Sequence, residues 1–425
     1  MLDIKFIREN KELIAQGAQK KRIKFDVEAL ISLDTERRDL LSKVENQRAE
    51  QNAATEKISQ AQDPAERTRL IDSMKVVKET MQADEEKLKE VMKKWQALML
   101  EVPNIPDISV PEGESDADNR EERVWGTQPV MNFEPKDHIE IMEKLDIVDF
   151  ERGVKVAGFR GYFLKGLGAQ LELAVWNLAV EMLTRKGYQF IIAPSRVRRE
   201  SFVGTGMIPQ SEEDLYKVGE NEYLAGTAEV PTMGYHMNET LAATDLPKKY
   251  LAFSPCFRAE AGKHGKDVKG LIRVHEFFKM EQVILCEASH TESVRLHEEL
   301  TQNAEEIMQA LKLHYHVVVN CGADLGLGQV KKYDIEAWMP SQKKFRETHS
   351  SSYFHDFQTR RLNIRYKDAE GKVRYTHSLN NTAVATPRIL ACIIENYQQA
   401  DGSVIIPEVL RPYMGGATVI APRTI

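Results

Sequence analysis

The sequence has few cysteines, no long apolar run and no excess of positive charge, and each absence excludes a class of protein. Its 425 residues include only four cysteines, which lie far apart and form no C-x-x-C pair: Cys256, Cys286, Cys321 and Cys392. This spacing argues against a zinc site or a disulfide framework and favours reduced thiols in a cytosolic protein. No apolar segment approaches the length needed to cross a membrane, and the first ten residues are too charged for a signal peptide. We therefore expect a cytoplasmic protein without membrane contact.

The charge balance is not that of a general nucleic-acid binder. Asp and Glu outnumber Lys and Arg by 65 to 58, which gives a formal net charge of −7. Any contact with RNA must therefore depend on local basic patches. The chain is long enough to form two domains with a sizeable core.

A heptad repeat in the N-terminal quarter is the longest regular pattern in the chain. Mostly apolar residues recur at alternating three- and four-residue steps over residues 30–61 and again over residues 70–98, with Arg37, Gln47, Gln51 and Asp84 as the polar members. Between the two runs stands Pro64, and proline suits the first turn of a new helix. The pattern predicts an antiparallel helical hairpin with arms of roughly 50 Å, in which Leu33 lies opposite Trp95. Considered alone, it favours a dimerisation coiled coil over an RNA-binding arm.

The remainder of the chain has the pattern of a compact α/β domain. A polar linker at residues 105–122 has the composition of an exposed loop. An apolar helix pattern at residues 169–183 is followed by a strand pattern that begins at Tyr188 and ends at Pro194.

A strand–loop–strand pattern at residues 250–281 is the most informative stretch. Its loop, residues 261–270, is rich in glycine and lysine. In the returning strand a period of two would place four side chains on one face: Arg273, Phe277, Lys279 and Glu281. Such a face suits a phosphate or carboxylate and a flat base better than it suits a core. In isolation, a solvated hairpin with a ladder of ion pairs is the simpler interpretation.

Three further motifs carry groups that could bind a substrate. Thr227-Ala228-Glu229 offers a hydroxyl, an amide and a carboxylate, although the same residues begin many helices. Glu347 and the nearby Ser350 could hold Mg²⁺ beside nucleotide phosphates, and a serine-rich turn is the alternative. Arg388 begins a helix after a strand of small residues.

Taken in chain order, these segments resemble the three motifs of class II aminoacyl-tRNA synthetases. Residues 171–194 are similar to motif 1, which builds the dimer interface in that class. Residues 250–281, with Phe257-Arg258-Ala259-Glu260, resemble motif 2, and residues 377–397 resemble motif 3. Because a helical hairpin comes first and no room is left for a C-terminal anticodon-binding domain, the chain resembles the bacterial-type seryl-tRNA synthetases from end to end. Matches also occur at Asp356-Phe357-Gln358 and Glu395-Asn396-Tyr397-Gln398.

The resemblance implies a fold and an activity. Residues 1–104 would form a tRNA-binding domain with a coiled-coil arm at about 27–101, and residues 123–425 a catalytic α/β (α+β) domain with an antiparallel sheet flanked by helices. The enzyme would activate L-serine with ATP and transfer it to tRNA-Ser, and also to selenocysteine tRNA. It would be a homodimer whose arm binds the tRNA variable arm, across the dimer. A synthetase-like ligase and an RNA-binding relative without charging activity are the alternatives.

The resemblance also assigns residue roles. Catalysis would depend on Arg258 and Arg388. Serine would contact Thr227, Ala228, Glu229, Arg258, Glu281 and Thr382. ATP would contact Arg258, Ala259, Glu260, Val274, Phe277, Glu347, Thr348, His349, Ser350 and Arg388. Mg²⁺ would be held by Glu347 and Ser350, with no zinc expected. Thr348-His349 departs from the commoner family pattern, which leaves the roles of these two residues open. The arm residues expected to contact tRNA phosphates include Arg48, Lys57, Arg67 and Lys75.

Overall fold

The computed structural model describes residues 1–261 and 269–422 and divides the chain into two units. One unit comprises Met1–Gln19 and Ile23–Pro103, and the other comprises Lys20–Arg22 and Asn104–Ile425. We call them the arm unit and the catalytic unit. The middle of the loop expected at residues 261–270 lies outside the described residues.

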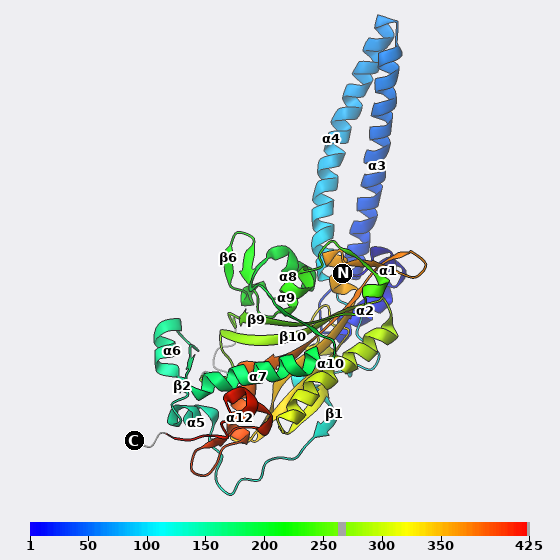
Figure 1. Ribbon diagram of the computed structural model, residues 1–425. Helices are drawn as coiled ribbons and strands as arrows, with labels where there is room; N and C mark the ends of the chain where they lie inside the picture. The colour runs from blue at the N-terminus through cyan, green and yellow to red at the C-terminus, as the bar shows by residue number, and fades with distance from the viewer. Residues whose placement is uncertain (262–268, 423–425) are drawn as a thin grey trace. The chain divides into compact units, whose positions relative to one another are not determined.

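Two long helices dominate the arm unit, α3 (Val27–Gln60) and α4 (Pro64–Glu101) (Figure 1). Asp63 caps α4 by accepting a hydrogen bond from the Ala65 amide, and Pro64 occupies the first turn. The helices pair antiparallel, because Lys43 contacts Asp84 at 2.9 Å and the Arg37 guanidinium lies 4.6 Å from the Trp95 ring centroid. The predicted antiparallel hairpin is confirmed.

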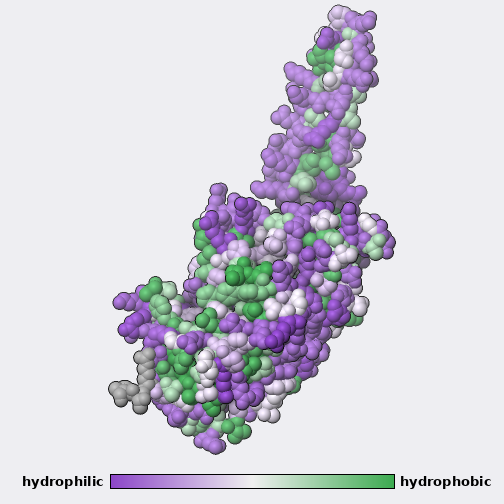
Figure 2. Space-filling model, viewed as in Figure 1, coloured by the Kyte–Doolittle hydropathy of each residue, from purple (hydrophilic) through white to green (hydrophobic). Residues whose placement is uncertain are grey.

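The apolar packing of the arm unit is concentrated at one end of the hairpin. Helices α1 (Ile4–Glu9) and α2 (Lys11–Lys20) contribute Ile7 and Ile14, which are fully buried, as is Leu30 of α3. Towards the connecting turn the helices are largely exposed, and the surface of the hairpin is mostly hydrophilic (Figure 2). The end near the turn therefore has little apolar burial to stabilise it.

An eight-stranded sheet forms the centre of the catalytic unit. Its strands lie in the order β1 (Arg120–Trp125), β11 (Tyr315–Val319), β12 (Lys331–Met339), β13 (Lys344–His355), β16 (His377–Ala385), β10 (Glu276–Cys286), β9 (Lys248–Phe257) and β4 (Gln189–Ile192). Every neighbouring pair is antiparallel except β4 and β9, which are parallel. The predicted antiparallel sheet flanked by helices is confirmed.

Side chains of β10 alternate between two environments, as the period-two pattern predicts. Met280 and Ile284 join the main core with residues of α7 (Leu167–Thr184), α10 (His290–Ala310) and α12 (Thr386–Asn396). Val283 and Leu285 point the other way and pack with residues of α9 (Glu229–Gly234) and α11 (Phe357–Leu362). Further along that second face, Phe277, Lys279 and Glu281 line a cavity. The sheet therefore separates the main core from the cavity.

Smaller elements complete the catalytic unit. They are α5 (His138–Lys144), α6 (Phe150–Ala157), α8 (Arg199–Thr205), the pair β2 (Val148–Asp149) and β3 (Phe163–Leu164), the sheet β5 (Arg196–Arg198), β7 (Glu222–Leu224) and β6 (Lys217–Gly219), the sheet β15 (Val373–Tyr375), β14 (Arg365–Lys367) and β8 (Thr240–Ala242), and the pair β17 (Val404–Ile405) and β18 (Val419–Ile420). The four cysteines are buried free thiols. Within the described residues, no helix is both long and apolar enough to span a membrane.

Four local expectations differ from the structure. The linker expected at residues 105–122 ends in β1, which pairs with β11 because its backbone groups complete the sheet. The alternative of a serine-rich turn around Ser350 is wrong, since the segment is the long strand β13. Helix α12 begins at Thr386, two residues before Arg388, where the sequence placed its start, and Pro387 lies in its first turn. The apolar helix expected at residues 169–183 extends from Leu167 to Thr184 as α7, in which eight residues are buried and Leu173 is 51% exposed.

Candidate active site

A cavity of about 490 Å³ opens on the sheet face that carries Phe277, Lys279 and Glu281. Its walls come from β10, β13 and β16, from the chain around Arg258 and from α12. Its size is typical of a site for a small molecule or nucleotide. The polar groups of the motifs singled out in the sequence meet here, although they are far apart in the chain.

Two arginines and an aromatic ring form one part of the cavity wall. The Arg258 guanidinium lies 5.3 Å from the Phe277 ring centroid, and its Nε donates to the Gly226 carbonyl at 3.2 Å. The Arg388 Nε donates to the Ile272 carbonyl at 3.0 Å. Both guanidiniums are therefore held by main-chain oxygens while keeping other N–H groups for a ligand. Fixed guanidiniums are well suited to phosphate and carboxylate groups.

Asp214 holds the turn that follows Arg258. Its carbonyl oxygen accepts a hydrogen bond from the Ala259 amide, and its carboxylate accepts one from the Ala261 amide at 2.9 Å. Glu260 between them has a positive φ of 52°, and its carboxylate contacts Arg273 at 3.2 Å. The turn thus directs Glu260 into the cavity.

Glu347 supplies the carboxylate closest to Arg388. Its Oε2 lies 3.2 Å from the Arg388 Nη1, and the same Nη1 donates a hydrogen bond to the Glu347 carbonyl oxygen at 2.8 Å. Burial raises the pKa of Glu347, but the charges of Arg388, Lys332 and Arg258 outweigh it and hold the pKa below its ordinary value. Glu347 is therefore an anion at neutral pH.

The Glu347 carboxylate and the nearby Ser350 hydroxyl could serve as two of the ligands of a Mg²⁺ ion. Ser350, on the same strand, also lines the cavity. Within the described residues no cluster of three or more His, Cys, Asp or Glu side chains could hold a metal by itself. One carboxylate and one hydroxyl are too few for a protein-only cage, but they suit Mg²⁺, which takes remaining ligands from water and substrate phosphates.

A carboxylate pair and two hydroxyls form another part of the wall. Glu281 and Thr382 are register partners on β10 and β16. Glu281 contacts the Lys279 ammonium at 2.5 Å, and Glu229 and Thr227 complete the group. Glu229 begins α9, and its amide donates to the Thr227 hydroxyl at 3.3 Å. Glu229 therefore stands at a helix start, and both Thr227 and Glu229 line the cavity.

Glu229 has an unusual ionisation for a carboxylate. Burial, with a further contribution from the charge of Glu281, raises the pKa of Glu229 to about 7. The Gln358 amide donates to Glu229 Oε1 at 2.6 Å and, with Lys279 and Asn380, opposes this rise. An incoming cation such as an ammonium group would stabilise the ionised form further.

Most predicted site residues line the cavity, and three do not. Those that do are Thr227, Glu229, Arg258, Glu260, Val274, Phe277, Glu281, Glu347, Thr348, Ser350, Thr382 and Arg388. Ala228, Ala259 and His349 are absent from the walls. The His349 ring is buried and its Nε2 donates to the Ala383 carbonyl at 3.1 Å, while burial lowers its pKa to about 4. The His349 side chain is thus neutral and occupied within the sheet, and is not available to ATP.

Sequence reasoning missed several residues that hold the walls in place. Gln358 belongs to a motif that was noticed but given no role. Lys21 is buried, and its ammonium donates to the carbonyls of Gly326, Leu327 and Gln329 at 2.6–3.0 Å. That segment lines the cavity. Only the run of three lysine and arginine residues at 20–22 was visible in sequence, and a run does not reveal which member is buried.

Comparison with known proteins first defines the class. The family profile described as tRNA synthetase class II core domain (G, H, P, S and T) matches residues 213–397, which contain the cavity strands β10, β13 and β16. The catalytic unit is therefore a class II aminoacyl-tRNA synthetase core. A second profile, Seryl-tRNA synthetase N-terminal domain, matches residues 1–106.

Full-length relatives then define the family. A serine–tRNA ligase of Deinococcus radiodurans is 45% identical over 421 residues, covering 99% of each chain. The crystal structure of seryl-tRNA synthetase from Pyrococcus horikoshii complexed with ATP superposes with a TM-score of 0.91 at 39% identity over the whole of both chains. The crystal structure of the cytoplasmic serine–tRNA ligase from Naegleria fowleri in complex with AMP superposes with a TM-score of 0.87 at 33% identity, covering 100% of this chain and 99% of that one. This chain belongs to the seryl-tRNA synthetase family.

Proposed function

We propose that this enzyme activates L-serine with ATP and transfers the seryl group to tRNA-Ser. The supporting observation is that one cavity combines two anchored arginines and an aromatic ring with a buried carboxylate pair and hydroxyls. The arginines and the ring suit a nucleoside triphosphate, and the carboxylates and hydroxyls suit the ammonium and hydroxyl of serine. Relatives of known structure were solved with ATP and AMP.

In the first step, an oxygen of the serine carboxylate attacks the α-phosphorus of ATP. The bond from that phosphorus to the bridging oxygen breaks, which gives seryl-adenylate and pyrophosphate. Arg258 stabilises the charge that develops at the α-phosphate, and Arg388 binds the γ-phosphate. Phe277 and Glu260 hold the adenine. The protein supplies no covalent intermediate, so orientation and charge stabilisation carry the catalysis. Mg²⁺, held by Glu347 and Ser350, would neutralise phosphate charge.

Serine is held by groups that recognise its two polar ends. The carboxylate of Glu229 binds the ammonium, while Glu281 and Thr382 bind the hydroxyl. In the second step a hydroxyl at the 3′ end of the tRNA attacks the seryl carbonyl carbon, and AMP leaves. The ionised form of Glu229 is required, because a neutral carboxyl would lose its attraction for the ammonium.

The arm unit serves recognition of tRNA-Ser through its variable arm. Lys57, Arg67 and Lys75 are exposed and make no ion pair within the described chain, whereas Arg48 contacts Glu85 at 2.6 Å. The first three are therefore better placed to neutralise phosphates. We also propose that selenocysteine tRNA is a substrate and that the enzyme acts in the cytoplasm.

Serine-dependent exchange of labelled pyrophosphate into ATP tests the activity. We expect exchange with serine and none above background without an amino acid, and we expect tRNA-Ser to accept the serine. A ligase for a carrier protein would catalyse exchange but leave tRNA uncharged. A relative without activity would catalyse no exchange, and either result would contradict the proposal.

We propose a homodimer held by the catalytic unit. The proposal depends on exposed apolar residues of the sheet edge β4, of α6 and of α7: Phe190, Ile192, Val154, Val156 and Leu173. Figure 2 shows hydrophobic residues over the sheet near β9 and beside α6. An unpaired apolar edge strand is normally covered.

Sedimentation of a variant lacking residues 27–101 is expected to give the dimer mass. The apolar residues of β4 and α6 remain in this variant, whereas both long helices are removed. A monomer would show that the helical hairpin, the other candidate dimerisation element, joins the protomers. Replacing Ile192 by Asp in the full-length chain provides the complementary test and is expected to weaken the dimer.

A further inference from the structure

A short main-chain segment, Leu271–Val274, forms part of the nucleotide end of the cavity. All four of its residues line the cavity, and the Ile272 carbonyl receives the Arg388 Nε at 3.0 Å. Arg273 contacts Glu260 at 3.2 Å. A displacement of this segment would therefore move Arg388 and Glu260 together, without touching the carboxylate pair at Glu229 and Glu281.

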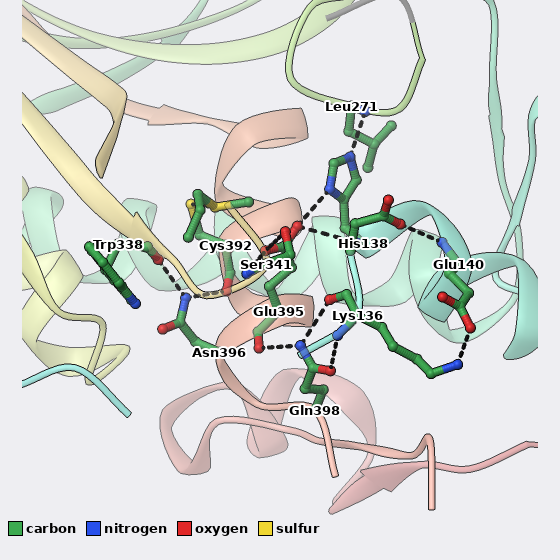
Figure 3. Close-up of polar contacts among 12 residues, drawn as sticks. Lys136, His138, Glu140, Leu271, Trp338, Ser341, Cys392, Glu395, Asn396 and Gln398 are labelled. Atoms are coloured by element: carbon green, nitrogen blue, oxygen red, sulfur yellow. Dashed lines mark hydrogen bonds and ion pairs between the residues drawn. The ribbon is translucent and has the colours of Figure 1, made fainter. Parts of the chain in front are cut away.

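The segment is held by a buried histidine that does not line the cavity. The Leu271 amide donates to His138 Nε2 at 3.1 Å, so this nitrogen carries no proton (Figure 3). The proton is on His138 Nδ1, which donates to Glu395 Oε1 at 2.9 Å. His138 is 3% exposed and Glu395 is fully buried. The imidazole thus connects α12 to the segment in one tautomer.

Glu395 is fixed in turn by three other donors. The His138 amide donates to Oε1 at 3.0 Å, while the Ser341 amide and hydroxyl donate to Oε2 at 3.2 Å and 2.7 Å (Figure 3). With the imidazole these make four donors, which is the number of lone-pair sites that a carboxylate offers. A carboxylate filled in this way has no freedom to accept a different histidine tautomer.

Gly270 allows the segment to approach the imidazole. Its φ is +86°, and an added Cβ would stand 2.4 Å from His138 Nε2. A side chain at position 270 would thus be strained and would collide with the atom that accepts the Leu271 amide. The backbone is shaped for this contact.

We propose that His138, oriented by Glu395, is a positioning residue for the ATP site and acts through the Leu271 amide. It holds Leu271–Val274 so that the Ile272 carbonyl aligns Arg388 and Arg273 restrains Glu260. Its loss would impair ATP binding while leaving the serine pocket in place. The inference rests on the proposed function only in assigning this end of the cavity to ATP.

Two substitutions of His138 separate positioning from packing. In His138→Gln the side-chain oxygen reaches about as far as Nε2 and can still accept from Leu271. In His138→Asn the amide nitrogen takes the place of Nδ1 and can still donate to Glu395, but Leu271 loses its acceptor. We expect His138→Asn to raise the KM for ATP about tenfold, as for an unmet buried amide. His138→Gln should stay within about threefold of wild type, and the KM for serine should change less than about twofold in both.

Thermal melts of both variants establish that each is folded, and calorimetric titration with ATP alone measures the same contrast without serine. If the wild type catalysed no serine-dependent exchange, the proposed function would be wrong. The ATP titration would still test the role of His138. Gly270→Ala provides an independent variant and is expected to weaken ATP binding as His138→Asn does. Equal ATP defects in the Asn and Gln variants would assign His138 to packing only and overturn the inference, as would a normal ATP affinity in His138→Asn.

Discussion

Deletion of residues 27–101 is expected to leave serine-dependent pyrophosphate exchange nearly unchanged and to reduce charging of tRNA-Ser by about a hundredfold or more, because several phosphate contacts disappear. The main core of the catalytic unit contains no residue of the deleted segment. Lys21 and Asn104, which hold the cavity segment Gly326–Gln329, remain in the variant. Exchange and charging rates, measured on the same preparation, decide the matter.

A shorter deletion provides the control for folding. Removing residues 27–101 also removes the buried residues of both long helices, including Leu30, Leu40, Val91 and Met99. Removing only residues 49–82 and closing the helices with a short turn keeps Leu30, Leu40, Val91 and Met99. Both deletions should lower charging and spare exchange. A folded variant that lost exchange would place part of the arm unit in the active site, contrary to the proposal.

Substitutions near the turn test which charges matter. Replacing Lys57, Arg67 and Lys75 together by Gln is expected to lower tRNA affinity and to flatten its dependence on salt, since each lost phosphate contact lowers the slope by about one. Replacing Arg48, which already contacts Glu85, should have a smaller effect. An unchanged salt dependence in the triple variant would remove these three residues from the tRNA contact.

The elements that carry the site could be predicted because their sequence patterns are local. The heptad steps predict α3 and α4, and the period-two pattern at Phe277, Lys279 and Glu281 matches their common place on β10. The two strands of the strand–loop–strand pattern are β9 and β10, and Arg388 lies in the first turn of α12. In each case the residues that set the pattern also make the element.

The rest depends on contacts between distant segments, which a sequence pattern does not encode. His138 precedes Leu271 by 133 positions and Glu395 by 257. Nothing in its neighbourhood marks it, because a histidine at a helix start is compatible with an exposed surface. His349 shows the opposite case: its place in the motif suggested a ligand, whereas its ring is buried and donates to the Ala383 carbonyl. Side-chain direction in β13 therefore had to come from the structure.

The serine end of the cavity explains why Glu281 should control selection by the hydroxyl. Glu281 is 3% exposed and faces Thr382 in the register of β10 and β16. A pocket built to hydrogen-bond a hydroxyl leaves its own polar groups unpaired when alanine binds, at a cost of about 1–3 kcal/mol and more beside a charge. Such a site can reject the analogue by up to about 10⁴-fold without editing. Threonine keeps the hydroxyl, so its extra methyl must be excluded by shape.

Replacing Glu281 by Ala is therefore expected to reduce serine activation by about a hundredfold or more and to shrink the preference for serine over alanine, with the KM for ATP little changed. Because the substitution also deprives Lys279 of its partner at 2.5 Å, Glu281→Gln is the control: it keeps an oxygen acceptor and should retain more of the preference.

The charge of Glu281 helps to raise the pKa of Glu229 to about 7. Glu229 gains its charge as the pH rises through that value, so wild-type kcat/KM for serine should fall below about pH 7.

Removing the Glu281 charge lowers the pKa of Glu229, and the acid limb of kcat/KM for serine should therefore move to lower pH in both variants. Pyrophosphate-exchange kinetics with serine, alanine and threonine between pH 5.5 and about 8.5 measure the preference and the limb together. A preference for serine over alanine that stayed the same in Glu281→Ala would remove Glu281 from the hydroxyl pocket and weaken the assignment of serine as the substrate. An acid limb that did not move would instead show that Glu229 is not the group whose ionisation governs serine binding.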